Sequence, residues 1–312
     1  MGLLVDGQWV DKWYETDKND GKFERQASQF RDEISPDVNA KFPAENHRYH
    51  LYVSLACPWA HRTLIYRKLK GLEAIIGLSV VSPDMLEHGW SFGSFPEATG
   101  DTLYGHDFLH QLYTSVNDTI TTRVTVPVLW DKKEKTIVNN ESADIIRMFN
   151  SAFNEMTGNR LDFYPKPLHN QIDETNHFVY HNINNGVYKA GFATTQQAYE
   201  EAVSALFDAL EEIETRLEGQ SYLVGDQLTE ADWRLFTTLI RFDAVYVGHF
   251  KCNIKRIADF PNLSRYVEML YLHPGVSDTV NMAHIKRHYY YSHAHINPTQ
   301  VIPIGPELPF IK

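Results

Sequence analysis

The pattern that most constrains this chain is a strand that runs directly into a cysteine, a proline and an amphipathic helix. Residues 47–54 alternate aromatic or branched side chains with polar ones, which is typical of a strand. Cys57-Pro58 follows, and proline suits the first helical position because its missing N–H needs no partner there. Apolar residues then recur at helical spacing until Gly71, and residues 74–81 form a second, mostly apolar strand. The sequence therefore predicts a βαβ unit with Cys57 at its first turn.

The remainder of the chain divides by pattern into an arm, a mixed domain and a helical domain. Residues 1–45 are polar and show no lasting helical or strand period, so we expect an extended N-terminal arm. Residues 46–155 hold the βαβ unit, a long irregular insertion at 83–122, strands at 126–131 and 136–138, and a helix that begins near Glu141. After about residue 158 the strand signals fade, and we expect long helices at 169–185, 195–218, from 229 onward and at 261–272. We therefore expect an α/β domain over 46–155 and an all-helical domain with a C-terminal tail over 156–312.

Composition narrows the class of protein. The chain of 312 residues has 29 basic and 40 acidic residues, a formal net charge of −11 that argues against a nucleic-acid partner. No apolar stretch has transmembrane length, and the N-terminus lacks the pattern of a signal peptide, so we expect no membrane association. The two cysteines lie far apart in the sequence, which favours a reducing compartment. We expect a cytoplasmic protein.

The position of Cys57 favours a reactive thiol. A helix N-terminus carries a partial positive charge and several N–H groups that a thiolate at this position would face. His61 and Arg62 fall in the first turns and are expected to add positive charge. The alternative is a buried structural cysteine, which is the commoner fate of a single cysteine and our interpretation of Cys252.

The motif Ser54-Leu55-Ala56-Cys57-Pro58-Trp59-Ala60 resembles the active-site turn of glutathione transferases that use a cysteine. Val126-Pro127 resembles their cis-proline turn, and Glu141-Ser142 resembles their γ-glutamyl-binding pair. The stretch from Thr229 to Asp232 resembles a helix capping box, which matches a motif of their helical domain. The closest resemblance is to the glutathionyl-hydroquinone reductases, the Xi class. It covers nearly the whole chain, including the stretches His88-Gly89-Trp90, Asn185 to Phe192 and Ile296-Asn297-Pro298. The resemblance implies the glutathione transferase fold, with a thioredoxin-like N-terminal domain and an all-α C-terminal domain.

The resemblance also implies a set of glutathione-binding residues. Arg123 would pair with a carboxylate, and the backbone of Val126 would pair with the cysteinyl backbone as a short added strand. Glu141 would accept from the ligand's ammonium group, and Trp90 would cover the peptide. The whole implied set is Trp90, Arg123, Val124, Thr125, Val126, Pro127, Glu141 and Ser142. Without the resemblance, Trp90 reads as a loop anchor and Arg123 as a surface arginine.

Three tyrosines match the positions where this family places phenols over its substrate pocket: Tyr188, Tyr246 and Tyr289. A phenol can donate a proton and hydrogen-bond a hydroquinone oxygen. Since the chain has 17 tyrosines, packing is the alternative for each of them. The run Tyr289-Tyr290-Tyr291 also leaves open which ring would face the site.

The histidines near the C-terminus suggest a zinc site, which we reject. His284 and His288 have the i, i+4 spacing that holds zinc on a helix. Neither a carboxylate nor a cysteine lies close enough in the sequence to complete the site, so we expect solvated or packing roles for these rings and no metal.

The resemblance therefore implies an enzyme that removes glutathione from glutathionyl-hydroquinones through a Cys57–glutathione mixed disulfide, with glutathione as co-substrate and the catalytic set Cys57, Tyr188, Tyr246 and Tyr289. One alternative is an omega-like thioltransferase or dehydroascorbate reductase that uses the same cysteine. The other is a non-catalytic binding protein with this fold. The family resemblance further implies a homodimer.

Overall fold

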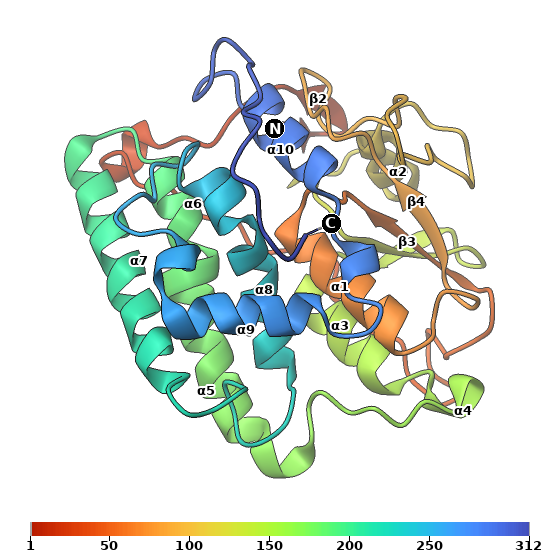
Figure 1. Cartoon of the computed structure of the whole chain (residues 1–312). Helices are drawn as coiled ribbons and strands as arrows, with labels where there is room; N and C mark the ends of the chain where they lie inside the picture. Colours follow the sequence, from red (N-terminus) through yellow and green to blue (C-terminus); the bar gives the residue numbers. More distant parts are fainter. Residues whose placement is uncertain (1, 312) are drawn as a thin grey trace. The chain divides into compact units, whose positions relative to one another are not determined.

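The computed structural model describes residues 2–311 (Figure 1). These residues group into two compact units. The first unit holds the described residues up to 13, residues 26–161 and residues 278–294. The second holds residues 14–25, residues 162–277 and the described residues from 295 onward. The expected segments 1–45, 46–155 and 156–312 divide the chain by position along the sequence. The two units divide it by contact, so each unit is built from separate stretches.

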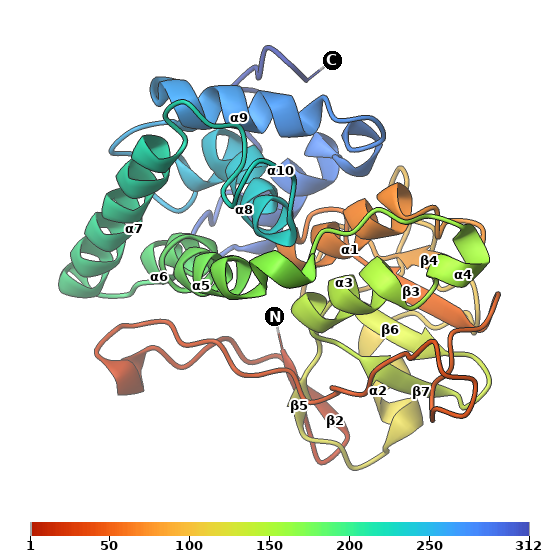
Figure 2. The same ribbon diagram turned by 90° about the horizontal axis from the view of Figure 1, so that it is seen from below.

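A four-stranded sheet forms the centre of the first unit. Its strand order is β4-β3-β6-β7, with bounds Gly77–Val80, Tyr49–Val53, Val128–Asp131 and Thr136–Asn139. Strand β3 pairs in parallel with β4 and antiparallel with β6, and all five of its residues are buried. Helices α1 (Pro58–Leu69) and α3 (Ser142–Ser151) pack together on one face, and α2 (Leu109–Val116) lies beside β7 on the other (Figure 2). The predicted βαβ unit and the two later strands are confirmed.

The N-terminal segment corrects the prediction of an arm without strands. Strands β1 (Leu3–Val5) and β2 (Gln8–Val10) form an antiparallel hairpin, and β1 also pairs with β5 (Thr122–Arg123). The turn residues Asp6 and Gly7 have φ angles of 47° and 75°. An Asp-Gly pair with two positive φ angles is the preferred two-residue hairpin turn. That dipeptide, between Leu3-Leu4-Val5 and Gln8-Trp9-Val10, is the sequence signal for the hairpin.

The insertion at 83–122, expected to be irregular, contains helix α2 and the short strand β5. Helix α2 spans only two turns, and its start is fixed by a side chain. Gln111 Oε1 accepts hydrogen bonds from the backbone N–H groups of Asp107 and Phe108, both at 2.9 Å. A helix this short has too few turns for apolar periodicity to stand out in the sequence.

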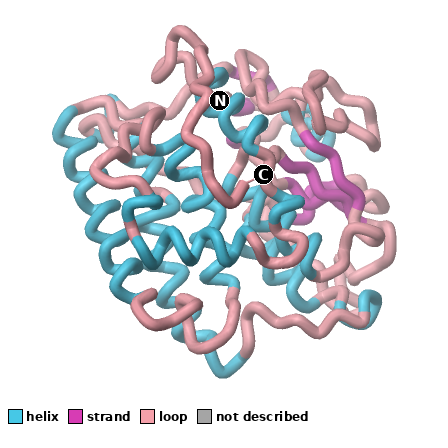
Figure 3. Tube along the Cα trace, viewed as in Figure 1, coloured by secondary structure: helices cyan, strands magenta, loops and turns pink. Residues whose placement is uncertain are grey.

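All seven strands that the structure describes lie in the first unit, and the second is built from helices (Figure 3). Its main helices are α5 (His169–Val179), α6 (Gly186–Gly191), α7 (Gln196–Arg216), α8 (Glu230–Arg241) and α9 (Pro261–Tyr271). The single helix expected at 169–185 is instead α5 followed by a π-helical turn at Tyr180–Asn184. The capping box before α8 is confirmed, because the Thr229 backbone N–H donates to Asp232 Oδ2 at 2.7 Å.

Two further helices, α4 (Asn154–Thr157) and α10 (Met282–Ser292), belong to the first unit. Helix α10 therefore belongs to the same unit as the strands, although it follows the last of them by more than a hundred residues. Among residues 2–311, none of the helices combines the length and the apolar character that crossing a membrane requires.

Candidate active site

Cys57 lies where the sequence placed it, between the end of β3 and the start of α1. Its backbone is extended, with φ −74° and ψ 122°, and it is the N-cap residue that directly precedes Pro58. The carbonyl of Cys57 accepts the first intrahelical bond from His61 N at 2.9 Å. The side chain is 9% exposed, so the sulfur lies at the helix start but is largely withdrawn from bulk water. The sulfur thus lies at the N-terminal end of α1, where the helix dipole is positive.

The loop that faces the cysteine is the predicted proline turn. The Val126-Pro127 peptide bond is cis, and the Cys57 thiol donates to the carbonyl oxygen of Val126 at 3.7 Å. The structure therefore brings together Cys57 and Val126, which are 69 positions apart in the sequence. Val124 and Val126 are both buried, so their side chains anchor the loop while its backbone faces the sulfur.

A residue that the sequence analysis missed, Tyr113 of α2, holds this loop in place. Its hydroxyl donates to the carbonyl of Thr125 at 2.9 Å and accepts from Asn140 Nδ2 at 3.2 Å. Burial raises the pKa of Tyr113, so the phenol keeps its proton and its role as a donor. No local motif marks this tyrosine, because both of its partners lie beyond its own helix.

Glu141 and Ser142 begin α3, as expected. Glu141 is the N-cap residue, and its Oε1 accepts from the Ala143 backbone N–H at 3.1 Å and from Ser142 Oγ at 3.4 Å. The side chain of Ser142 is buried, whereas that of Glu141 is half-buried. A carboxylate at a helix N-terminus is stabilised by the helix dipole.

Arg62, expected as a source of positive charge near Cys57, also joins the two helices of this face. Its guanidinium lies 4.6 Å from the centre of the Trp59 ring and donates from Nη1 to Ser142 Oγ at 3.4 Å. The side chain is only 2% exposed. The ring of His61, the other residue expected to add positive charge, hydrogen-bonds to Thr279, with its Nε2 2.8 Å from Thr279 Oγ1.

Arg123 lies at the end of β5 and lines a cavity of about 230 Å³. Its Nη1 donates to the carbonyl of Lys12 at 2.7 Å and its Nη2 to that of Trp13 at 3.2 Å. These two bonds tie the guanidinium to the residues that directly follow the β1–β2 hairpin. The other lining residues are mostly polar: Leu3, Gln26, Ala27, Ser28, Gln29, Thr121, Thr122, Thr125 and Asn140.

Trp90 is held in the insertion by α10. Its ring stacks on that of His288 with a centroid separation of 4.7 Å and an interplanar angle of 21°, and it is 5% exposed.

His288 Nδ1 lies 3.0 Å from the carbonyl of Pro83, and His284 Nε2 lies 2.6 Å from that of Pro96. Arg287 forms a two-bond ion pair with Asp84, at 2.6 and 2.9 Å. The histidines of α10 therefore hold the insertion by its backbone, and within residues 2–311 no three His, Cys, Asp or Glu side chains are grouped to hold a metal ion.

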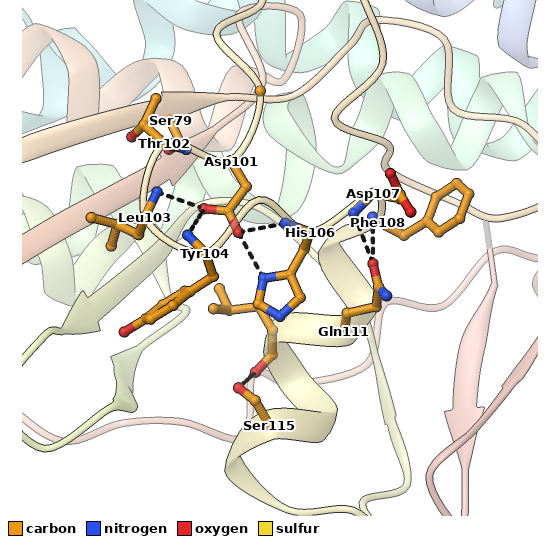
Figure 4. A network of polar contacts seen from close by, with 12 residues as sticks. Ser79, Asp101, Thr102, Leu103, Tyr104, His106, Asp107, Phe108, Gln111 and Ser115 are labelled. Atoms are coloured by element: carbon orange, nitrogen blue, oxygen red, sulfur yellow. Dashed lines mark hydrogen bonds and ion pairs between the residues drawn. The ribbon is translucent and has the colours of Figure 1, made fainter.

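The far part of the insertion is organised around one carboxylate, Asp101 (Figure 4). Its oxygens accept from the backbone N–H groups of Leu103 and His106, both at 3.1 Å, and from His106 Nδ1 at 2.6 Å. Tyr52 of β3 donates its hydroxyl to the same carboxylate at 3.0 Å. Burial raises the pKa of Asp101, but the hydrogen bonds from His106, Leu103 and Tyr52 outweigh it, and the net shift is downward. This carboxylate ties the insertion to the central strand.

The three candidate tyrosines belong to different units. Tyr188 of α6 and Tyr246, at the end of a π-helical turn, lie in the second unit with ring centroids 6.2 Å apart. Arg25 lies 5.0 Å from the centre of the Tyr188 ring and donates from Nε to Asn185 Oδ1 at 2.9 Å. Tyr289 lies in the first unit on α10 and is 1% exposed, whereas Tyr290 and Tyr291 are half-buried. Two of the three candidate rings, those of Tyr188 and Tyr246, therefore lie close to each other.

The other cysteine, Cys252, has different surroundings. It is fully buried in the second unit, and its thiol donates to the carbonyl of Phe250 at 3.8 Å. Burial raises the pKa of the Cys252 thiol well above its ordinary value. This environment fits the structural role expected for it.

Comparison with known proteins agrees with this geometry. The family model for the N-terminal domain of glutathione S-transferases matches residues 56–152, and that for the C-terminal domain matches residues 196–268. The glutathionyl-hydroquinone reductase YqjG of Escherichia coli is 57% identical over 98% of this chain and 95% of its own, and PcpF of Sphingobium chlorophenolicum is 53% identical over 99% and 97%. The glutathione-bound structure of YqjG superposes with a TM-score of 0.91 and 52% identity, over 100% of this chain and 97% of that one. The glutathione S-transferase Xi of Phanerochaete chrysosporium superposes with a TM-score of 0.90 and 55% identity, over 93% and 99%.

The chain therefore belongs to the glutathione S-transferase family and, within it, to the Xi class that includes the glutathionyl-hydroquinone reductases. The predicted fold class, a thioredoxin-like domain with an all-helical domain, is confirmed by the same comparisons.

Proposed function

We propose that this protein is a glutathionyl-hydroquinone reductase that uses glutathione as its co-substrate. The observation that carries the proposal is the position of Cys57, at the N-terminus of α1 and 3.7 Å from the Val126 carbonyl. Relatives at 53% and 57% identity over nearly the full chain carry this activity in their names.

The first half of the reaction forms a mixed disulfide. The Cys57 thiolate attacks the sulfur of the glutathionyl-hydroquinone, a new sulfur–sulfur bond forms, and the bond from sulfur to the aromatic carbon breaks. That carbon takes the electron pair of the broken bond and must gain a proton. We propose Tyr188 as the donor. The hydroquinone leaves, and Cys57 remains joined to glutathione.

The second half regenerates the thiol. A second glutathione, as its thiolate, attacks the glutathionyl sulfur of the mixed disulfide, so that oxidised glutathione leaves and Cys57 becomes a thiolate again. Ala60 occupies the position of the second cysteine in a Cys-x-x-Cys motif, so an internal disulfide at this turn cannot compete with the external thiol. The two half-reactions together consume one substrate and one glutathione.

The binding residues proposed for glutathione lie in the first unit. Support comes from the grouping of Thr125 and Arg123 around one cavity and from the hydrogen bond that Ser142 Oγ donates to Glu141 Oε1 at the start of α3. The full proposed set remains Trp90, Arg123, Val124, Thr125, Val126, Pro127, Glu141 and Ser142. Tyr246 and Tyr289 are proposed to line the substrate pocket. The homodimer and the cytoplasmic location remain predictions.

Intact-protein mass spectrometry tests the proposal directly. After incubation with a glutathionyl-hydroquinone and no added glutathione, the protein is expected to gain the mass of one glutathionyl group at Cys57 and to release hydroquinone. Adding glutathione is expected to remove the adduct and yield oxidised glutathione. A protein that forms the adduct only from small disulfides would instead be an omega-like thioltransferase. One that forms no adduct from either substrate would be a binding protein.

A further inference from the structure

The segment that follows the N-terminal hairpin lies along the edge of the central sheet and reaches the start of α3. The backbone N–H of Asp32 donates to the Val138 carbonyl at 3.0 Å, and that of Asn140 donates to the Phe30 carbonyl at 3.1 Å. Arg31 Nη2 pairs with Asp144 Oδ1 of α3 at 2.9 Å. Residues 28–34, which we call the edge segment, thus cover β7, the strand at this edge of the four-stranded sheet.

One side chain of the edge segment contacts the proposed ligand-binding carboxylate. Ser28 Oγ lies 3.1 Å from Glu141 Oε2 and 3.3 Å from the Asn140 carbonyl. Ser28 and Asn140 also line the cavity shared with Arg123 and Thr125. The edge segment is therefore a wall of this cavity as well as a cover for the sheet.

The hydrogen bonds to Glu141 define its orientation at both oxygens. Oε1 accepts from the Ala143 N–H and from Ser142 Oγ, and Oε2 accepts from Ser28. A carboxylate offers about four acceptor sites, so three donors within the chain fix its plane and still leave capacity for a ligand. The two contacts to Oε1 come from α3 itself, whereas the contact to Oε2 depends on a residue more than a hundred positions earlier.

We propose that Ser28 is a positioning residue for Glu141, and that through it the edge segment sets the preference for peptides that carry a γ-glutamyl ammonium group. The proposal rests on the glutathione-binding role proposed above for Glu141. Ser28 holds the carboxylate in one rotamer, so that the ammonium group meets an acceptor that is already oriented. A preoriented acceptor binds more tightly because the ligand does not pay for ordering it.

The experiment is a double-mutant cycle read out as the Kd for glutathione by isothermal titration calorimetry. Ser28→Ala is expected to raise Kd about tenfold, the size of one hydrogen bond to a charged group. Ser28→Thr keeps a hydroxyl and is expected to stay within about threefold of the parent protein. In a Glu141→Ala background, Ser28→Ala is expected to add no further loss, because the group that it orients is gone.

The matched control is Ser35→Ala. Ser35 lies just beyond the edge segment and its hydroxyl accepts from the Asp37 N–H at 3.1 Å, in a local turn. It is expected to leave Kd unchanged. A glutathione analogue without the amino group is expected to bind the parent protein and Ser28→Ala equally, since Glu141 then has no ammonium group to meet.

Two results would overturn the inference: an unchanged Kd in Ser28→Ala, or an equal loss from Ser28→Ala when Glu141 is already alanine. The latter would mean that the serine only anchors the backbone. Failure of the proposed function would show differently, as the absence of a glutathionyl adduct on Cys57 in the parent protein. The calorimetric cycle and the mass measurement therefore separate the two ideas.

Discussion

The turn around Cys57 and the insertion at 83–122 are both parts of the first unit, but they are built by different means. The turn is positioned by the backbone: a strand end, a helix start and the Val126 carbonyl at 3.7 Å from the sulfur. The insertion is positioned by side-chain contacts with distant parts of the chain. Tyr52 of β3 donates to Asp101, whereas Arg287 and His288 of α10 bond to the Asp84 carboxylate and the Pro83 carbonyl. Substitutions in the turn should therefore change chemistry with little effect on stability, whereas those in the insertion should do the reverse.

The largest effect is expected at Cys57 itself. Cys57→Ala should abolish reductase turnover, because no other group in this turn supplies a thiolate, and should leave the free energy of unfolding within about 1 kcal/mol of the parent value. Steady-state kinetics and urea unfolding on the same samples measure both. Cys252→Ala is the control, expected to keep turnover because Cys252 is fully buried and its thiol stays protonated. Residual turnover in Cys57→Ala would refute the thiol mechanism.

The next effect concerns the proton given to the aromatic carbon. Tyr188→Phe should slow reduction of a glutathionyl-hydroquinone about a hundredfold, the usual cost of losing one general acid. Exchange with a small mixed disulfide should change little, since its leaving thiolate needs no such proton. Stopped-flow kinetics with both substrates make the comparison, with Tyr246→Phe and Tyr289→Phe as parallel variants. Equal effects on both substrates would mean that the ring of Tyr188 only packs.

A smaller effect is expected at Glu141. Glu141→Ala should raise the KM for glutathione about tenfold while lowering kcat much less, because the contact is remote from the sulfur. Glu141→Gln separates a charge contact with the ligand from a role as helix cap. It keeps an oxygen to accept from the Ala143 N–H but removes the charge, so it should behave like the alanine variant if the charge matters. Recovery of the parent KM in the glutamine variant would indicate a helix cap rather than a ligand contact.

The same contrast explains how far the sequence alone could predict the molecule. Strand β3, Cys57 and helix α1 are adjacent in the chain, so period and helix-start signals were enough to find them. Tyr113, by contrast, holds Thr125 and Asn140, and Ser28 holds Glu141, through single hydrogen bonds between residues that no local pattern links. His284 and His288 had the spacing of metal ligands, yet their rings bond to loop carbonyls that only the folded chain brings near.

The prediction with the smallest effect on turnover concerns the insertion. Asp101→Asn keeps the shape of the side chain but replaces charge-assisted hydrogen bonds to Leu103, Tyr52 and His106 with neutral ones. We expect the free energy of unfolding to fall by about 2 kcal/mol, the size of one or two such bonds. The kcat with saturating substrate should change less than threefold, because Asp101 accepts hydrogen bonds from Tyr52, Leu103 and His106, none of which is proposed to bind glutathione or substrate.

The pH dependence of this loss identifies its cause. The pKa of Asp101 is lowered in the folded state relative to an ordinary aspartate, so its ionised form binds the folded structure better. Its contribution to stability is therefore present in full above the unfolded pKa of about 4 and is lost as pH falls through the folded value. Urea unfolding at pH 7 should show the full difference between the parent protein and Asp101→Asn, and the difference should shrink as pH falls below about 4. A difference that stays constant down to pH 3 would mean that the amide disturbs packing rather than charge, and that the insertion is not held by the carboxylate.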